Sequence, residues 1–231
     1  MRPASLRGIV YEDDDILVVD KPAGLLTSTG PRERRPTLLA RVQTHVAGNQ
    51  SRARVGLIHR LDRDASGLLV FSKNDPAYRS LKSQFFHHTV GREYRAVVHG
   101  VPVPPAGRIE TRLVERADGT VYSTRQHGKG QRAITDYEVI RTEGKSSLLR
   151  VILQTGRKHQ IRVHLSGRGT PVVGDISYGP DKSAARRLML AATRLTLAHP
   201  RTGDSMTFAI PIPPEFPVHE KRPRPSGCDL R

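Results

Sequence analysis

A run of five apolar residues directly follows a cluster of charged ones, and this junction constrains the fold more than any other stretch of the sequence. The stretch reads HRLDRDASGLLVFSKN over residues 59–74. Because residues 67–71 contain no polar side chain, they predict a strand that is covered on both faces of its sheet. The fold must therefore hold two arginines, a histidine and two aspartates at the end of a buried strand.

Two helices are predicted from apolar residues at helical spacing. The first covers residues 37–47, with Thr37 as its N-cap. The second covers residues 75–88, with Asp75 as its N-cap and Pro76 at its first position.

Hairpin-linked strands dominate the rest of the chain, which predicts an α+β fold with a mixed, largely antiparallel sheet. We expect about nine strands and three helices in a single domain over residues 1–215, followed by a basic, proline-rich tail over 216–231. A third helix or turn is expected near 184–189. Strands are expected at 8–11, 16–20, 67–71, 92–100, 133–140, 146–156 and around 193–198.

The net charge of +16, from 38 basic and 22 acidic residues, makes nucleic acid the leading candidate partner. The first residues lack the apolar core of a signal peptide, and no apolar run is long enough to cross a bilayer. The single cysteine, Cys228, excludes an internal disulfide framework and a thiolate metal cluster. These features predict a soluble, cytoplasmic protein.

Residues 155–167, TGRKHQIRVHLSG, are interpreted as a strand. Alternation would place Gln160, Arg162 and His164 on one face, toward a cleft or toward solvent, and the apolar residues between them on the other. His159 and His164 would point to opposite faces, so a metal site that uses both is not expected.

The HRLDRD segment, residues 59–64, is open to two interpretations. An arginine beside an aspartate favours its ionised form, and a fixed carboxylate can act as a nucleophile, a base or an electrostatic stabiliser. The same residues could instead form a structural ion-pair cluster. Their spacing alone does not decide between these interpretations.

A resemblance carried by five motifs in a fixed order favours the catalytic interpretation of residues 59–64. DKPAGLL (20–26), HRLDRDASGLLVFSKN (59–74), REYRAVV (92–98), TGRKHQIRVHLSGRGTPVVGD (155–175) and YG (178–179) resemble the RluA-type pseudouridine synthases. The resemblance runs from about residue 8 to residue 212, nearly the whole chain.

The resemblance implies a role for individual residues. Asp62 aligns with the catalytic nucleophile, Arg162 with the arginine that pairs with it, and Tyr94 with the tyrosine that lies against the target base and can handle the C5 proton. The implied substrate-binding residues are His59, Arg60, Arg157 and Leu190. Asp64 is expected to be structural.

The resemblance also implies the reaction, in which a uridine of rRNA or tRNA becomes pseudouridine within a central RNA-binding cleft. The N1–C1′ bond breaks, the base rotates, and C5 joins C1′. Asp62 could attack C1′, attack C6 or promote elimination to a glycal. No cofactor and no metal are needed. We expect a monomer without an obligate protein partner, without an N-terminal S4 RNA-binding domain, and with RNA contacts from the basic loops 31–36 and 125–132.

Two positions depart from the family pattern. Ala65 replaces the usual threonine, and Ala191 stands where many members carry histidine, which puts substrate contacts there in doubt. A catalytically silent RNA-binding domain is the alternative, but it would not need Asp62, Tyr94 and Arg162 together. A glycoside hydrolase that uses Asp62 and Asp64 is disfavoured by the absence of Trp. A metal-dependent nuclease would lose its activity on chelation.

Overall fold

The computed structural model describes residues 6–29, 35–49, 54–180 and 187–216. The helices are α1 (Leu38–Asn49), α2 (Asp75–Phe86) and α3 (Gln160–Gly167). The strands are β1 (Ile9–Glu12), β2 (Ile16–Lys21), β3 (Gly56–Leu57), β4 (Ser66–Ser72), β5 (Gly91–His99), β6 (Ala106–Glu115), β7 (Val121–Thr124), β8 (Gln131–Glu143), β9 (Ser146–Leu153), β10 (Leu190–Ala198) and β11 (Ser205–Ala209). None of these helices has the length and apolar character that a membrane span needs.

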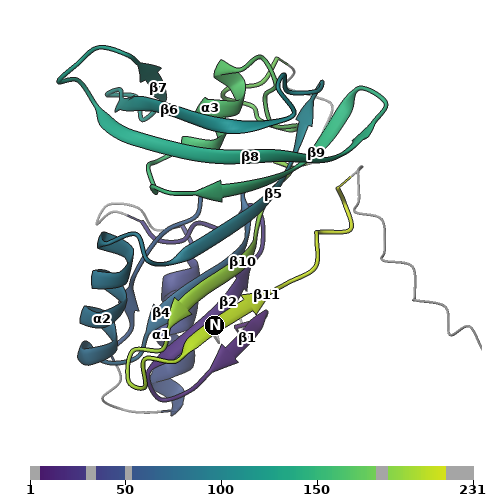
Figure 1. Cartoon of the computed structure of the whole chain (residues 1–231). Coiled ribbons are helices and arrows are strands. Elements are labelled where there is room, and N and C mark those ends of the chain that lie inside the picture. The colour runs from purple at the N-terminus through teal and green to yellow at the C-terminus, as the bar shows by residue number, and fades with distance from the viewer. Residues whose placement is uncertain (1–5, 30–34, 50–53, 181–186, 217–231) are drawn as a thin grey trace, which may run out of the picture.

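All eleven described strands belong to one sheet, in the order β1-β2-β4-β10-β5-β9-β8-β6-β7, with β3 paired to β4 and β11 to β10. Only β4 and β10 run parallel among the described pairs. In Figure 1, α1 and α2 lie beside β2 and β4, whereas α3 lies beside β6 and β7 at the other end of the sheet. The predicted α+β fold with a largely antiparallel sheet is confirmed.

Strand β4 is buried on both faces, as its apolar run predicts. Leu69 and Phe71 pack in the core cluster that contains the apolar face of α1. Leu68 and Val70 point to the opposite face and pack in a second cluster, which contains Leu81 of α2. The sheet therefore forms a layer between these two helices, and β4 carries the end of the charged loop into its centre.

The start of α1 agrees with the sequence, but the start of α2 does not. Thr37 Oγ1 accepts a hydrogen bond from Ala40 N at 3.1 Å, which confirms it as the N-cap of α1. The N-cap of α2 is Asn74, not Asp75, because Asn74 has an extended backbone and its side chain accepts from Ala77 N at 2.9 Å. Asp75 is the first helical residue.

The strand predicted within residues 155–167 is wrong, because residues from Gln160 onward form α3. The alternating pattern was misleading because the helix is buried over Gln160–Leu165, on its polar as well as its apolar sides. Strands β3, β6, β7 and β11 were not predicted. Of the helix or turn expected near 184–189, residues 184–186 lie outside the described residues and 187–189 are not helical. Of the tail predicted over 216–231, residues 217–231 lie outside the described residues, whereas Phe216 is fully buried in the main core.

Gly67 of β4 permits the close approach of β10. Its φ is +112°, and a Cβ at this position would lie 2.2 Å from the carbonyl oxygen of Ala192. Any side chain would therefore push β10 away from the loop that precedes β4.

We predict that Gly67→Ala lowers the free energy of unfolding by at least about 3 kcal/mol, because backbone strain adds to a backbone clash. Urea unfolding followed by circular dichroism measures this loss. Gly48→Ala is the control, since Gly48 lies in α1 with nothing within 4 Å of its Cβ position. It is expected to be neutral or to stabilise by up to about 1 kcal/mol. Equal stability of the two variants contradicts the packing argument.

Candidate active site

A cavity of about 980 Å³ lies between α2, the loop that precedes β4 and the segment that leads into α3. This volume is at the upper end of the range for ligand pockets, about 300–1,000 Å³. All seven site residues implied by the sequence resemblance line this cavity: His59, Arg60, Asp62, Tyr94, Arg157, Arg162 and Leu190. They come from the 58–65 loop, β5, the 154–159 segment, α3 and β10.

Arg162 of α3 connects two carboxylates. Its Nε and Nη2 each donate to Asp175 at 2.8 Å, and its Nη1 donates to Asp62 Oδ2 at 3.2 Å. The Asp175 side chain is fully buried and that of Arg162 is 7% exposed, whereas the Asp62 side chain is 22% exposed toward the cavity. Arg162 is thus fixed on its buried side and presents Asp62 on its open side.

Asp175 is a residue of this site that the sequence did not single out. Burial alone would raise its pKa, but hydrogen bonds and charge from Arg162, together with the amides of Ser177 and Tyr178, hold that pKa below its usual value. Burial likewise opposes the charge on Arg162, and Asp175 and Asp62 outweigh it and raise the pKa of the guanidinium. Asp175 lies inside the 155–175 motif, but nothing in the local pattern marks it as the partner of Arg162.

Tyr178 packs against the Arg162 guanidinium. The sequence had not assigned this tyrosine a role. Its ring lies 5.0 Å from the Arg162 guanidinium carbon. Its hydroxyl accepts from Val121 N at 2.9 Å and lies 2.7 Å from His159 Nδ1. These contacts tie α3 and the guanidinium to β7.

The backbone of the Asp62 loop is held by the end of β2 and by the segment that follows it. Lys21 is buried, and its ammonium donates to the carbonyl oxygens of Pro22, Leu25 and Arg63 at 2.8–2.9 Å. Thr27 Oγ1 donates to Leu61 O at 2.9 Å and accepts from Leu61 N at 3.2 Å. Burial lowers the pKa of Lys21 to about 8, and the charges of Asp64 and Asp62 oppose that shift.

Buried side chains also fix α3, which explains why its polar residues tolerate burial. Gln160 donates to Ile134 O and to Thr135 Oγ1, both at 2.9 Å. His164 lies 3.0 Å from Thr111 Oγ1 and 2.8 Å from Thr135 Oγ1, and burial lowers its pKa to about 4. His159 and His164 contact different residues and share no site.

The buried Tyr94 and the half-buried His59 form part of the cavity wall. Burial raises the pKa of Tyr94, and Asp62 adds to this effect while Arg92 opposes it. His59 accepts from Val70 N through Nε2 at 3.2 Å and stacks on Phe85, with ring centroids 4.5 Å apart. Burial, followed by the charges of Arg92 and Lys82, lowers the pKa of His59 to about 3.

The remaining residues to which the sequence drew attention do not contact Asp62 or Arg162 through a hydrogen bond among the described residues. Asp64 pairs with Arg63, and both side chains are more than a third exposed. Ala65 is buried at the cavity wall, next to Ser66, whose hydroxyl accepts from Arg187 at 2.6 Å. Ala191 is fully buried in the core and does not line the cavity. In the basic loops, residues 31–34 lie outside the described residues, whereas 125–129 are described and exposed.

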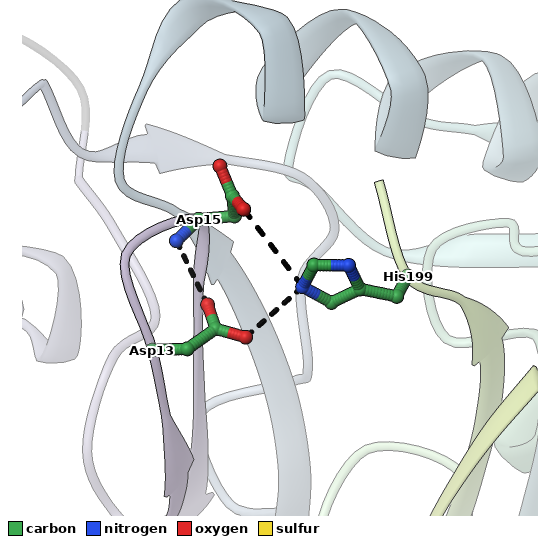
Figure 2. A group of neighbouring side chains, drawn as sticks. All are labelled: Asp13, Asp15 and His199. Atoms are coloured by element: carbon green, nitrogen blue, oxygen red, sulfur yellow. Dashed lines mark hydrogen bonds and ion pairs between the residues drawn. The ribbon is translucent and has the colours of Figure 1, made fainter. Parts of the chain in front are cut away.

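A second cluster, formed by Asp13, Asp15 and His199, lies away from the cavity and has the residue types of a metal site (Figure 2). Its carboxylates already accept protein hydrogen bonds. Asp13 accepts from the amides of Asp15 and Ile16, from Tyr11 and from His199. Asp15 accepts from Arg201 and Asn74. A cation would have to displace these donors, so we interpret the cluster as a link between the β1–β2 and β10–β11 turns.

A family model, curated sequences and solved structures all show similarity between this chain and pseudouridine synthases. A family model described as RNA pseudouridylate synthase matches residues 15–167. The chain is 38% identical to ribosomal large subunit pseudouridine synthase D of Zymomonas mobilis, over 90% of this chain and 70% of that protein. It is also 38% identical to an uncharacterized RNA pseudouridine synthase, YlyB, of Bacillus subtilis, with the same coverage. Among solved structures, human RNA pseudouridylate synthase domain containing 4 matches 91% of this chain and 90% of that chain, with a TM-score of 0.76 and 25% identity.

We predict that Asp175→Asn lowers the free energy of unfolding by about 3 kcal/mol or more at pH 7, because it leaves a buried guanidinium undercompensated. A carboxyl group whose pKa is lower in the folded than in the unfolded state stabilises the fold at pH values above its unfolded pKa, here 3.8. This stabilisation is lost as the pH falls through the pKa of the folded state. The difference from the wild type should therefore be full at pH 7 and shrink below about pH 4. Urea unfolding at several pH values measures it.

Asp136→Asn is the matched control for that experiment. Asp136 also binds an arginine through both oxygens, but the Arg108 side chain is 59% exposed. A surface pair of this kind contributes up to about 1 kcal/mol. Similar losses for the two variants would contradict the assigned role of Asp175.

Proposed function

The chain belongs to the RNA pseudouridylate synthase family, and from this premise we propose that it isomerises uridine to pseudouridine in ribosomal RNA with Asp62 as the catalytic nucleophile. One observation carries the assignment of Asp62. Its carboxylate is the acidic group that both opens to the cavity and binds the arginine of the second family motif, with Asp62 Oδ2 and Arg162 Nη1 3.2 Å apart. The other carboxylate on this guanidinium, Asp175, is fully buried and cannot reach a substrate.

The target uridine must leave its base stack to reach Asp62, which costs a few kcal/mol. Tyr94 and Leu190 lie on neighbouring strands of the cavity wall, where Tyr94 pairs with Ala192 and Leu190 with Ala96. An aromatic ring and an apolar side chain offset part of the unstacking cost by contact with the uracil. We therefore assign the base to this wall, with Tyr94 placed to handle the C5 proton.

The reaction begins with the Asp62 carboxylate and requires the N1–C1′ bond to break and a C5–C1′ bond to form. Attack at C1′, attack at C6 and elimination to a glycal all need a carboxylate that keeps its place while the base rotates. Arg162 holds the side chain, and Lys21 and Thr27 hold the backbone on either side of it through Arg63 O and Leu61. Support of both the side chain and the backbone suits a nucleophile that must stay in place while the base turns from one orientation to another.

Ribosomal RNA is proposed as the substrate because the curated relatives reported above include a protein named for the large ribosomal subunit. The charge of +16 supports binding to a polyanion, and the exposed Arg60 and the half-buried Arg157 add cations at the cavity. As part of this proposal the catalytic domain, predicted over residues 1–215, includes the core residue Phe216 as well, and the protein acts as a monomer in the cytoplasm.

Release of tritium from RNA labelled with [5-³H]uridine tests the proposal, because C5 loses its hydrogen when it joins C1′. Unmodified ribosomal RNA transcripts and total tRNA are assayed in parallel, with EDTA present. Release from ribosomal RNA is expected. Release from tRNA alone overturns the assigned substrate, and tight RNA binding without release from either pool favours a catalytically silent RNA-binding domain.

We predict that Asp62→Asn lowers the rate of tritium release by at least about 10³-fold, because it removes the nucleophile with little change in volume. RNA affinity should change by less than about threefold. Asp64→Asn is the matched control, since this aspartate lies two residues away in the same loop and pairs with the exposed Arg63. It should release tritium at close to the wild-type rate. Comparable turnover by the two variants contradicts the assignment of Asp62.

We predict that Tyr94→Phe lowers kcat by about 10²-fold with little change in KM, because the ring remains against the base while the hydroxyl is lost. Steady-state tritium release measures both constants. A rise in KM at unchanged kcat would instead give Tyr94 a binding role alone.

A further inference from the structure

Arg92 lies in the same cavity as the proposed nucleophile, but the proposed reaction does not use it. It is the second residue of β5, two positions before Tyr94, so the two side chains project from the same face of the strand. Its guanidinium carbon lies 5.6 Å from the centre of the Phe85 ring, at the α2 side of the cavity.

The charge of Arg92 has no carboxylate to balance it among the described residues that line the cavity. Asp62 binds Arg162, and Glu115 binds Lys158 at 2.6 Å. Arg92 Nη2 reaches only the carbonyl oxygen of Leu153, at 3.4 Å. Its Nε is buried and has no hydrogen-bond partner within the described ranges. A buried or half-buried guanidinium normally has its donors satisfied, so this one has unused binding capacity.

The surroundings of Arg92 are positive. Burial lowers the pKa of Arg92, Tyr94 opposes this shift, and the charge of Arg157 adds to it. The pKa of His88 is lowered by burial and then by Arg92 and Arg157. Lys82 also lines this wall of the cavity. Cations gathered without acids raise the local concentration of anions and favour one that bears a full negative charge.

The guanidinium is also held in place by packing. A Cβ on Gly156 would lie 2.4 Å from Arg92 Nη1, so the arginine occupies this position because residue 156 has no side chain. With Phe85 on one side and the 153–156 backbone on another, the planar group keeps its orientation before any ligand arrives. Such preorganisation reduces the conformational entropy that binding would otherwise lose.

We propose that Arg92 binds a phosphodiester group of the RNA next to the uridine that enters the cavity. A phosphodiester has one negative charge and two free oxygens, which match the donors of a guanidinium, whereas uracil is neutral. This inference rests on the proposed function, because the uridine in the cavity brings its flanking phosphates with it. The α2 wall therefore takes the backbone of the RNA, and the Asp62 side of the cavity takes the base.

The first test measures the affinity for an unmodified large-subunit ribosomal RNA transcript as a function of salt. Arg92→Gln should weaken binding by about 10-fold and make the slope of log K against log salt shallower by about 0.7 to 0.9, the value for one lost phosphate contact. Arg92→Lys should restore the slope, because it keeps the charge. Arg194→Gln is the control, since Arg194 is exposed on β10 and does not line the cavity.

Two variants separate phosphate binding from support of the fold. Urea unfolding checks that Arg92→Gln remains folded. Gly156→Ala keeps every charge but displaces the guanidinium, so it should weaken RNA binding in the same way. Wild-type affinity and slope in both Arg92→Gln and Gly156→Ala would overturn the inference.

The second test locates the phosphate. Short RNAs that contain the target uridine carry a neutral methylphosphonate at one flanking position at a time. At one position the wild type should lose about 10-fold in affinity, and Arg92→Gln should lose less than about twofold, because the contact is already absent. Equal losses in both proteins at every position overturn the role of Arg92, while tritium release by the wild type leaves the proposed function standing. Absence of tritium release overturns the proposed function, and the salt-dependence experiment still tests Arg92 because it needs no turnover.

Discussion

The buried interaction between Arg162 and Asp175 is the constraint on which the rest of the site depends. A guanidinium that is 7% exposed in a protein interior is strongly destabilising unless a carboxylate binds it with good geometry, and Asp175 does so through both oxygens at 2.8 Å. Because Asp175 compensates the charge, the third nitrogen of Arg162 is free to hold Asp62 at the edge of the cavity. The same residue therefore stabilises α3 within the fold and orients the carboxylate of Asp62 that faces the cavity.

The Asp62 loop is positioned by two supports that reach it from distant parts of the chain. Lys21 at the end of β2 and Thr27 in the segment after it fix the loop backbone, and α3 fixes the side chain through Arg162. A carboxylate attached to a loop alone would lose its geometry through small backbone motions, which rate enhancement tolerates poorly. Gly67 has a related role, since it lets β4 pack tightly against β10 directly after the loop. The proposed function thus accounts for the charged cluster beside a buried strand, because the central strand supplies rigidity and the loop at its end carries the proposed nucleophile.

Much of the fold near the site could be predicted from local sequence, and the failures have a common physical cause. The continuous apolar run of β4 and the helical spacing of α1 and α2 reflect packing against one or two faces, which a short window of sequence records. The helix α3 was predicted as a strand because its polar residues alternate with apolar ones, whereas in the fold Gln160, Arg162 and His164 are buried with partners from β6, β8 and the 175 region. Resemblance to the family indicated Asp62 and Arg162, but Asp175 lies 13 residues beyond Arg162 and only the tertiary fold brings them together.

Charge is distributed unevenly along the cavity, so that its α3 end and its α2 end differ in electrostatic potential. At the α3 end the acids of the cavity wall pair with cations: Arg162 binds Asp62 as well as the buried Asp175, and Lys158 binds Glu115. At the α2 end Arg92, Arg157 and Lys82 gather without a lining carboxylate of their own. A nucleotide has the same asymmetry, with a neutral base at one end and an anionic phosphate at the other. The electrostatic field therefore favours one orientation of the RNA, with its base toward Asp62, and disfavours the reverse, which would bring a phosphate against the carboxylate.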